Sequence, residues 1–190
     1  MNRYALQLVT APAEEPVDIV EARQWLKIPD GQSADDNLIE DIIKGLRANM
    51  EAEYGFAFVT QTWKILFDEF PCASYFSFGT WSVIELPKRP AQSVTHVKYY
   101  DINDAQQTLV ANTDYVVDVA SVPARIMPAY GKFWPTTRSK PNAVEIQFIA
   151  GYGTAATVPQ ELKRELQVRL THAYEHRGIV EMPANFAVGN

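Results

Sequence analysis

Two histidines and a glutamate near the end of the chain have the spacing of a zinc-peptidase motif. His172, Glu175 and His176 form H-x-x-E-H. On a helix both imidazoles lie on one face and could bind one ion, with Glu175 as the general base. This chemistry also needs a third protein ligand from a following helix, but the one carboxylate side chain after His176 is Glu181, in a segment without helical period. On a helical wheel both histidines flank a leucine stripe, as half-buried polar residues do. We therefore predict no catalytic or metal site, with a zinc-dependent hydrolase as the alternative hypothesis.

A second motif, "GYGTAA", has the spacing of a dinucleotide-binding loop. Gly151, Gly153 and Ala156 fit G-x-G-x-x-A between a predicted strand and a predicted helix, where small residues let the backbone approach a pyrophosphate. Such a site also needs a parallel strand after the helix that ends in an acidic residue. The acidic residue at the expected distance is Glu175, which lies inside the predicted helix. We therefore interpret the glycines as the exit from a strand and predict no bound cofactor.

A third stretch, "DINDAQQTLVAN", begins like a calcium-binding loop. Asp101, Asn103 and Asp104 stand at its start, but Gln106 replaces the glycine at position six and Asn112 replaces the glutamate at position twelve. We therefore predict a hairpin turn.

Composition and charge exclude several classes of protein. Cys72 is the only cysteine among 190 residues, which rules out an intrachain disulfide and a thiolate zinc cluster and favours an inert thiol. The formal net charge of −6 argues against binding nucleic acid by neutralising its phosphates, but not against surrounding it. No run approaches the ~20 apolar residues of a membrane helix, so we expect no membrane partner. The first residues lack the pattern of a secretory signal, and we expect synthesis in the cytosol.

Helical periodicity marks both ends of the chain. Residues 17–55 predict two helices, with Asp18 and Ser33 as N-caps, each followed three residues later by a carboxylate that can bond back to it. Gly55 is a natural residue to end the second helix. A third predicted helix has Pro159 in its first turn, where a missing N–H costs nothing, and Gly178 stops it.

Between the helices the period changes to two. "TQTWKILF" and "AVEIQFIAG" alternate apolar and polar residues, and shorter β-prone pieces separated by turns lie between them. The sequence therefore predicts an α+β protein, with an antiparallel β-sheet or small barrel inserted into a helical core. The expected division is 1–57 and 156–180 for the helical core, 58–155 for the β insertion and 181–190 for a C-terminal tail.

The order and spelling of several segments resemble the head–tail connector (adaptor, head-completion) proteins of tailed bacteriophages and prophages. The likeness covers about residues 15–180. It is carried by "PVDIVEARQWLKI", "DDNLIEDIIKGLRANMEAEYGFAFVTQTW", "IELPKRPAQSVTHVKYYD", "YVVD", "PARIMP", "WPTTRSKPNAVEIQFIAGYG" and "VPQELKRELQVRLTHAYEHRG". At the end of the last helix the family often has asparagine where this chain has His176, so the resemblance implies no metal site.

The resemblance implies a structural role in the virion neck. Connector subunits, about twelve of them, form a ring beneath the portal protein, extend the DNA channel, help retain packaged DNA and bind downstream neck, stopper or tail proteins. DNA would pass through without sequence-specific binding, which suits an acidic chain, and assembly would take place in the cytoplasm of the bacterial host. Because C-terminal segments in this family tend to engage the portal, the resemblance offers Met182, Pro183 and Phe186 as docking residues. Another neck or tail-completion protein is the alternative within the same class.

Overall fold

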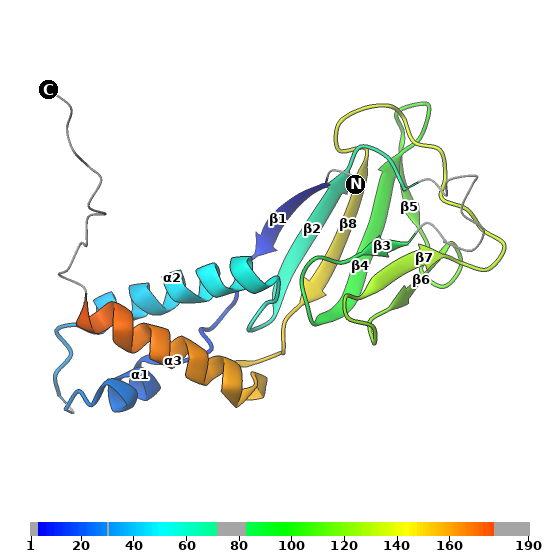
Figure 1. Cartoon of the computed structure of the whole chain (residues 1–190). Helices are drawn as coiled ribbons and strands as arrows, with labels where there is room; N and C mark the ends of the chain where they lie inside the picture. The colour runs from blue at the N-terminus through cyan, green and yellow to red at the C-terminus, as the bar shows by residue number, and fades with distance from the viewer. Residues whose placement is uncertain (1–3, 30, 72–82, 177–190) are drawn as a thin grey trace, which may run out of the picture.

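The structure is a computed structural model that describes residues 4–29, 31–71 and 83–176. Within these residues the helices lie at one end of the molecule and the sheets at the other (Figure 1). The helices are α1 (Ile19–Leu26), α2 (Asp36–Tyr54) and α3 (Gln160–Glu175), with a 3-10 turn, η1 (Ala155–Thr157), before α3. The strands are β1 (Tyr4–Thr10), β2 (Gln61–Phe67), β3 (Ile84–Glu85), β4 (Ala91–Tyr100), β5 (Gln106–Leu109), β6 (Tyr115–Asp118), β7 (Arg125–Pro128) and β8 (Val144–Ala150).

Helix α1 begins as its sequence predicts but uses its first-turn glutamate differently. The Asp18 carboxylate accepts the backbone N–H of Glu21 at 2.7 Å, which confirms Asp18 as the N-cap. The Glu21 carboxylate does not complete a capping box with Asp18. It accepts the amide of Gln167 at 2.9 Å and lies 3.6 Å from the ammonium of Lys163, both on α3. Instead of a capping box, the Glu21 side chain thus makes a tertiary contact between α1 and α3.

The start of α2 differs from the prediction, whereas its end agrees. Asp35, not Ser33, is the N-cap residue, and no side-chain hydrogen bond caps the helix. The Asp36 carboxylate pairs with the guanidinium of Arg23 on α1 instead of bonding back to Ser33. This ion pair between helices draws the first turn of α2 toward α1. Gly55 ends the helix with a φ of 67°, as predicted.

The three helices enclose one of two hydrophobic clusters. The helices contact one another in all three pairs, and the cluster also includes residues that follow α2 and precede α3. Its buried members are Val17, Ala22, Ile39, Ile43, Met50, Phe56, Phe58, Val59, Val158, Leu166 and Leu170. The predicted leucine stripe of α3 is therefore its buried face.

The strands form two antiparallel sheets rather than one. The larger has the order β1-β2-β8-β4-β5 and the smaller has the order β3-β7-β6. Along β8 the predicted alternation is confirmed, with Val144, Ile146 and Phe148 buried. The two sheets share the second hydrophobic cluster, in which Ile84, Leu86, Tyr115 and Ile126 meet the buried face of the larger sheet.

The predicted α+β class is confirmed, but the sequence analysis missed one strand. Residues 4–10, assigned to the helical core, form β1, an edge strand paired with β2 in the register Leu6 to Ile65. From β1 the chain therefore crosses into the helical layer and returns to the sheet at β2.

Candidate functional site

The histidine motif lies at an exposed helix end. His172, Glu175 and His176 lie at the end of α3 and are all exposed, not half-buried as we predicted. The two imidazoles stack with centroids 4.4 Å apart, and the Nδ1 atom of His176 lies 2.9 Å from the carbonyl oxygen of His172. No group of three or more potential metal ligands is present in the described ranges 4–29, 31–71 and 83–176. Among the described residues the two histidines therefore have no third ligand beside them.

The glycine motif is a tight crossing of two chain segments. Gly151 has a φ of 124°, and a Cβ atom at this position would lie 2.2 Å from the carbonyl oxygen of Val59. The backbone of Gly153 accepts the N–H of Thr60 at 2.8 Å. The segment leaves β8 and enters η1 and then α3, and no strand follows in the part of the chain that is described. The interpretation as a strand exit is confirmed.

The calcium-like stretch is a hairpin. Asp101 accepts the backbone N–H groups of Asn103 and Ala105 at 2.9 and 3.0 Å, and β4 pairs with β5 on either side. These bonds, with one from the amide of Gln107, lower the pKa of the Asp101 carboxyl. The Asp101 carboxylate therefore accepts backbone N–H groups of its own turn, and the hairpin prediction is confirmed.

Several predicted residues lie outside the described part of the chain. They are Cys72 and the proposed docking residues Met182, Pro183 and Phe186.

His96, on β4, is partly buried. Its Nε2 atom lies 2.9 Å from a carboxylate oxygen of Glu145 on β8, and Lys64 on β2 lies 3.5 Å from the other oxygen. Although partial burial opposes it, these two partners lower the pKa of the Glu145 carboxyl. The outer face of the larger sheet thus carries a polar cluster that the sequence did not predict.

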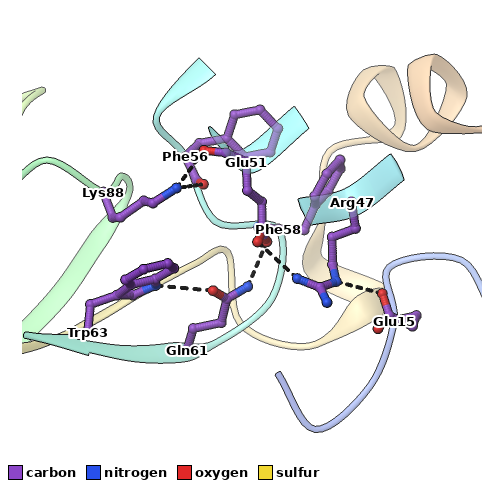
Figure 2. Close-up of polar contacts among 8 residues, drawn as sticks. All are labelled: Glu15, Arg47, Glu51, Phe56, Phe58, Gln61, Trp63 and Lys88. Atoms are coloured by element: carbon purple, nitrogen blue, oxygen red, sulfur yellow. Dashed lines mark hydrogen bonds and ion pairs between the residues drawn. The ribbon is translucent and has the colours of Figure 1, made fainter. Parts of the chain in front are cut away.

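A buried carboxylate joins the helices to the larger sheet (Figure 2). Glu51, in the last turn of α2, is only 4% exposed. Its Oε1 atom accepts the backbone N–H of Phe58 at 3.0 Å and the amide of Gln61, on β2, at 2.6 Å. Its Oε2 atom accepts the guanidinium of Arg47 at 3.0 Å, and Arg47 also donates to Glu15 at 2.7 Å. One side chain therefore fixes the end of α2, the turn that follows it and the first residue of β2.

A buried lysine completes this junction. Lys88 donates to the backbone carbonyl of Glu51 at 2.5 Å, and its ammonium lies 4.9 Å from the ring centroid of Trp63. Trp63 in turn donates to the side-chain oxygen of Gln61 at 3.1 Å. Burial lowers the pKa of the Lys88 ammonium, and the nearby Glu51 carboxylate opposes part of this shift. These contacts hold the two layers at one relative orientation.

Next to the junction lies an apolar hollow, which we call the junction groove. It has a volume of about 460 Å³. Its lining residues are Met50, Tyr54, Phe56, Arg89, Pro90, Val122, Tyr152, Leu162 and Glu165. Val122 is 69% exposed, and Tyr54 and Tyr152 are also among the exposed large apolar side chains. The groove is therefore an open and mostly apolar surface.

None of the helices in the described ranges is long and apolar enough to cross a membrane.

Solved structures with the same fold come from phage-like particles. No protein-family model matches this sequence, and no curated protein matches it. A chain in the neck of an empty gene transfer agent (GTA) particle, computed with C6 symmetry, is similar at 21% identity with a TM-score of 0.71, over 95% of this chain and 88% of that chain. A chain in the virion of a native GTA particle has 21% identity and a TM-score of 0.73, over 94% and 89% of the two chains. The neck of a native GTA particle computed with C12 symmetry gives a TM-score of 0.68 at 21% identity, over 94% and 88%.

This similarity extends over helices and sheets together, so the whole described architecture is shared and not one layer alone.

The sequence patterns did not reveal the residues that hold the helices against the larger sheet. Arg47 and Glu51 are four apart on α2, a spacing that also describes an ordinary surface ion pair. Only the burial of Glu51 reveals their role.

Proposed function

We propose that this protein is a structural subunit of the neck of a tailed phage, prophage or phage-like particle. The observation that carries the proposal is the shared fold with chains of GTA necks over 94–95% of this chain. The dispersed resemblance of residues 15–180 to head–tail connectors supports the same class from the sequence. The function is geometric, and we assign it no catalytic residue.

Within the neck, we propose the role of the connector, or adaptor. Such a subunit repeats around the particle axis below the portal protein, lines a channel for DNA and presents a surface to the next neck or tail protein. The C6 and C12 symmetries of the similar structures support a ring, and twelve subunits is the number we propose. A heterologous interface of this kind forms a ring when its rotation closes. The net charge of −6 suits a channel that DNA slides past.

The test is electron microscopy of particles produced without this gene. We expect heads that have lost part of their DNA, together with unattached tails, and recovery of complete particles when the gene is restored. An averaged reconstruction of complete particles should contain this fold in a ring below the portal. Normal, infectious particles without the gene would contradict the proposal. Particles with a normal connector ring but a defect further along the neck or tail would assign the chain to a stopper or tail-completion role instead.

A further inference from the structure

Another hollow lies on the outer face of the larger sheet, the face turned away from the shared hydrophobic cluster. It has a volume of about 310 Å³, and every strand of this sheet contributes to its lining. Successive residues of a strand point to opposite faces, so a side chain next to a core residue, as Lys98 is next to Val97, faces outward. We call this feature the sheet hollow and define it by Gln7, Lys64, Lys98, Gln106, Asn142 and Glu145.

The lysines of the sheet hollow outnumber its carboxylates. Both oxygens of Glu145 already have partners, because His96 lies 2.9 Å from one oxygen and Lys64 lies 3.5 Å from the other. Lys98 stands opposite Glu145 in the register of β4 and β8, yet no carboxylate among the described residues forms an ion pair with its ammonium. Two ammonium groups and one carboxylate leave one positive charge in the hollow without a counter-charge.

The other acidic residues near the rim are bonded elsewhere. Asp104, in the turn between β4 and β5, pairs with Lys140 at 3.0 Å. Asp101 accepts the backbone N–H groups of its own turn, as described above. Asp68, at the end of β2, accepts the backbone N–H of Asn142 at 2.8 Å. Within the described ranges, no acidic side chain at this rim is therefore left to pair with Lys98.

The floor of the sheet hollow is apolar, whereas its rim can donate hydrogen bonds. Leu66 and Ala143 line it, are only 7% and 1% exposed, and belong to neither hydrophobic cluster. The rim carries the side-chain amides of Gln7, Gln106 and Asn142. A short aliphatic chain that ends in a carboxylate matches this arrangement, since its methylene groups cover the floor and its oxygens accept from the rim. A phosphate group has oxygens on every side and leaves the apolar floor uncovered.

We propose that the sheet hollow binds the side chain of a glutamate or aspartate from a partner subunit, with its carboxylate paired to Lys98. The bound carboxylate supplies the missing negative charge, so Lys64 and Lys98 then face two carboxylates. The side chains of Lys64 and Glu145 are only 30% exposed, and charges that are partly buried are screened less than exposed ones. In its choice of partner the inference rests on the proposed function, because a neck subunit is surrounded by other neck subunits.

The first test is an NMR titration of the full chain at low salt with N-acetyl-glutamate methylamide, which presents one glutamate side chain. The amide signals of Leu66, Lys98 and Ala143 should shift and saturate. The glutamine analogue, which lacks the charge, and inorganic phosphate should each bind roughly 10-fold more weakly or not at all. Lys98→Met keeps the aliphatic stem and should weaken binding of the glutamate analogue roughly 10-fold or more, and Lys98→Gln should do the same. Lys44→Met is the matched control, because Lys44 lies on α2, with a side chain 52% exposed, and should leave binding unchanged.

The second test measures whether a partner covers Lys98 in complete particles. An amine-reactive acetylating ester is applied to particles and to the free chain, and mass spectrometry of the digested protein gives the rate at which Lys98 is modified. We expect slower modification of Lys98 in particles, because an ammonium that is paired with a carboxylate and covered by a partner reacts poorly. The same particles after denaturation give the reference rate.

Several outcomes would overturn the inference. In the titration they are the absence of saturable binding of the glutamate analogue, binding that Lys98→Met and Lys98→Gln leave unchanged, and tighter binding of inorganic phosphate than of the carboxylate. In particles, equal modification of Lys98 in the assembled and the free chain would overturn the assignment of the partner to the neck. If the chain is absent from necks, the proposed function fails separately. The titration needs only the purified chain and then still decides whether the sheet hollow binds a carboxylate.

Discussion

Replacing Glu51 by alanine tests the account of the junction between helices and sheet. The carboxylate accepts three donors in a site that is almost closed to water, and alanine accepts none of them. Arg47 keeps a second carboxylate partner, Glu15, at 2.7 Å. The backbone N–H of Phe58 and the amide of Gln61 lose the acceptor that they share, the Oε1 atom of Glu51.

The magnitude follows from these two donors and the ion pair. Each buried donor left without an acceptor costs about 1–3 kcal/mol. Breaking a buried ion pair by removing one partner costs about 3–5 kcal/mol, and the two effects overlap. We therefore expect the free energy of unfolding to fall by about 3–5 kcal/mol in Glu51→Ala. For a chain of this length 1 kcal/mol corresponds to about 2–4 °C, so the unfolding midpoint should fall by about 6–20 °C.

The assay is thermal and urea unfolding followed by circular dichroism. Glu51→Gln keeps one acceptor oxygen and should cost less, about 1–3 kcal/mol. Glu40→Ala is the matched control, because Glu40 is on the same helix but exposed, 3.8 Å from Lys44, and should cost under about 1 kcal/mol. If Glu51→Ala unfolds at the same temperature as Glu40→Ala, the buried carboxylate does not stabilise the junction and the reasoning is wrong.

Three further predictions concern other sites. Gly151→Ala places a Cβ atom 2.2 Å from the carbonyl oxygen of Val59 at a φ of 124°, and urea unfolding should show a loss of about 2–5 kcal/mol; an unchanged midpoint would contradict the crossing. The hydrogen bond from the Ser121 hydroxyl is the largest cause that lowers the pKa of Asp118 to about 2. Between pH about 2 and about 4 the unfolded chain therefore binds more protons than the folded chain. The contribution of Asp118 to the stability of the fold is lost as the pH falls through that window. In Ser121→Ala a carboxyl-detected NMR titration should show a higher midpoint for Asp118, and an unshifted midpoint would refute the assignment. Protein purified with zinc present should hold well below one equivalent of metal by mass spectrometry, whereas one equivalent that is lost in His172→Ala would restore the zinc hypothesis.

Local patterns predicted the elements well where short-range effects decide them. The cap at Asp18, the positive φ of Gly55 and the alternation in β8 all appear as predicted. Ser33 is not the N-cap of α2, because the Asp36 carboxylate that was expected to bond back to Ser33 pairs with Arg23 on α1 instead. The strand at residues 4–10 was missed, although Leu6 and its neighbours alternate, because its pairing partner in β2 lies far along the chain.

The candidate site divides in the same way. In the sequence each of the three motifs lacks parts that its chemistry needs, and the structure places the motifs in an exposed helix end, a strand exit and a hairpin turn. The sequence could not show that Glu51 is buried or that a groove lies between α2, α3 and the turn at Val122. Burial and hollows arise from segments that are distant in sequence, so no local pattern encodes them.

The sequence by itself determined the α+β class and most helix and strand positions, because periodicity and caps act over a few residues. Tertiary structure alone decided which charges became structural and which apolar residues stayed in water. Glu51 is enclosed by segments that converge only when the helices meet the sheet, whereas Tyr130 is 99% exposed and belongs to neither hydrophobic cluster.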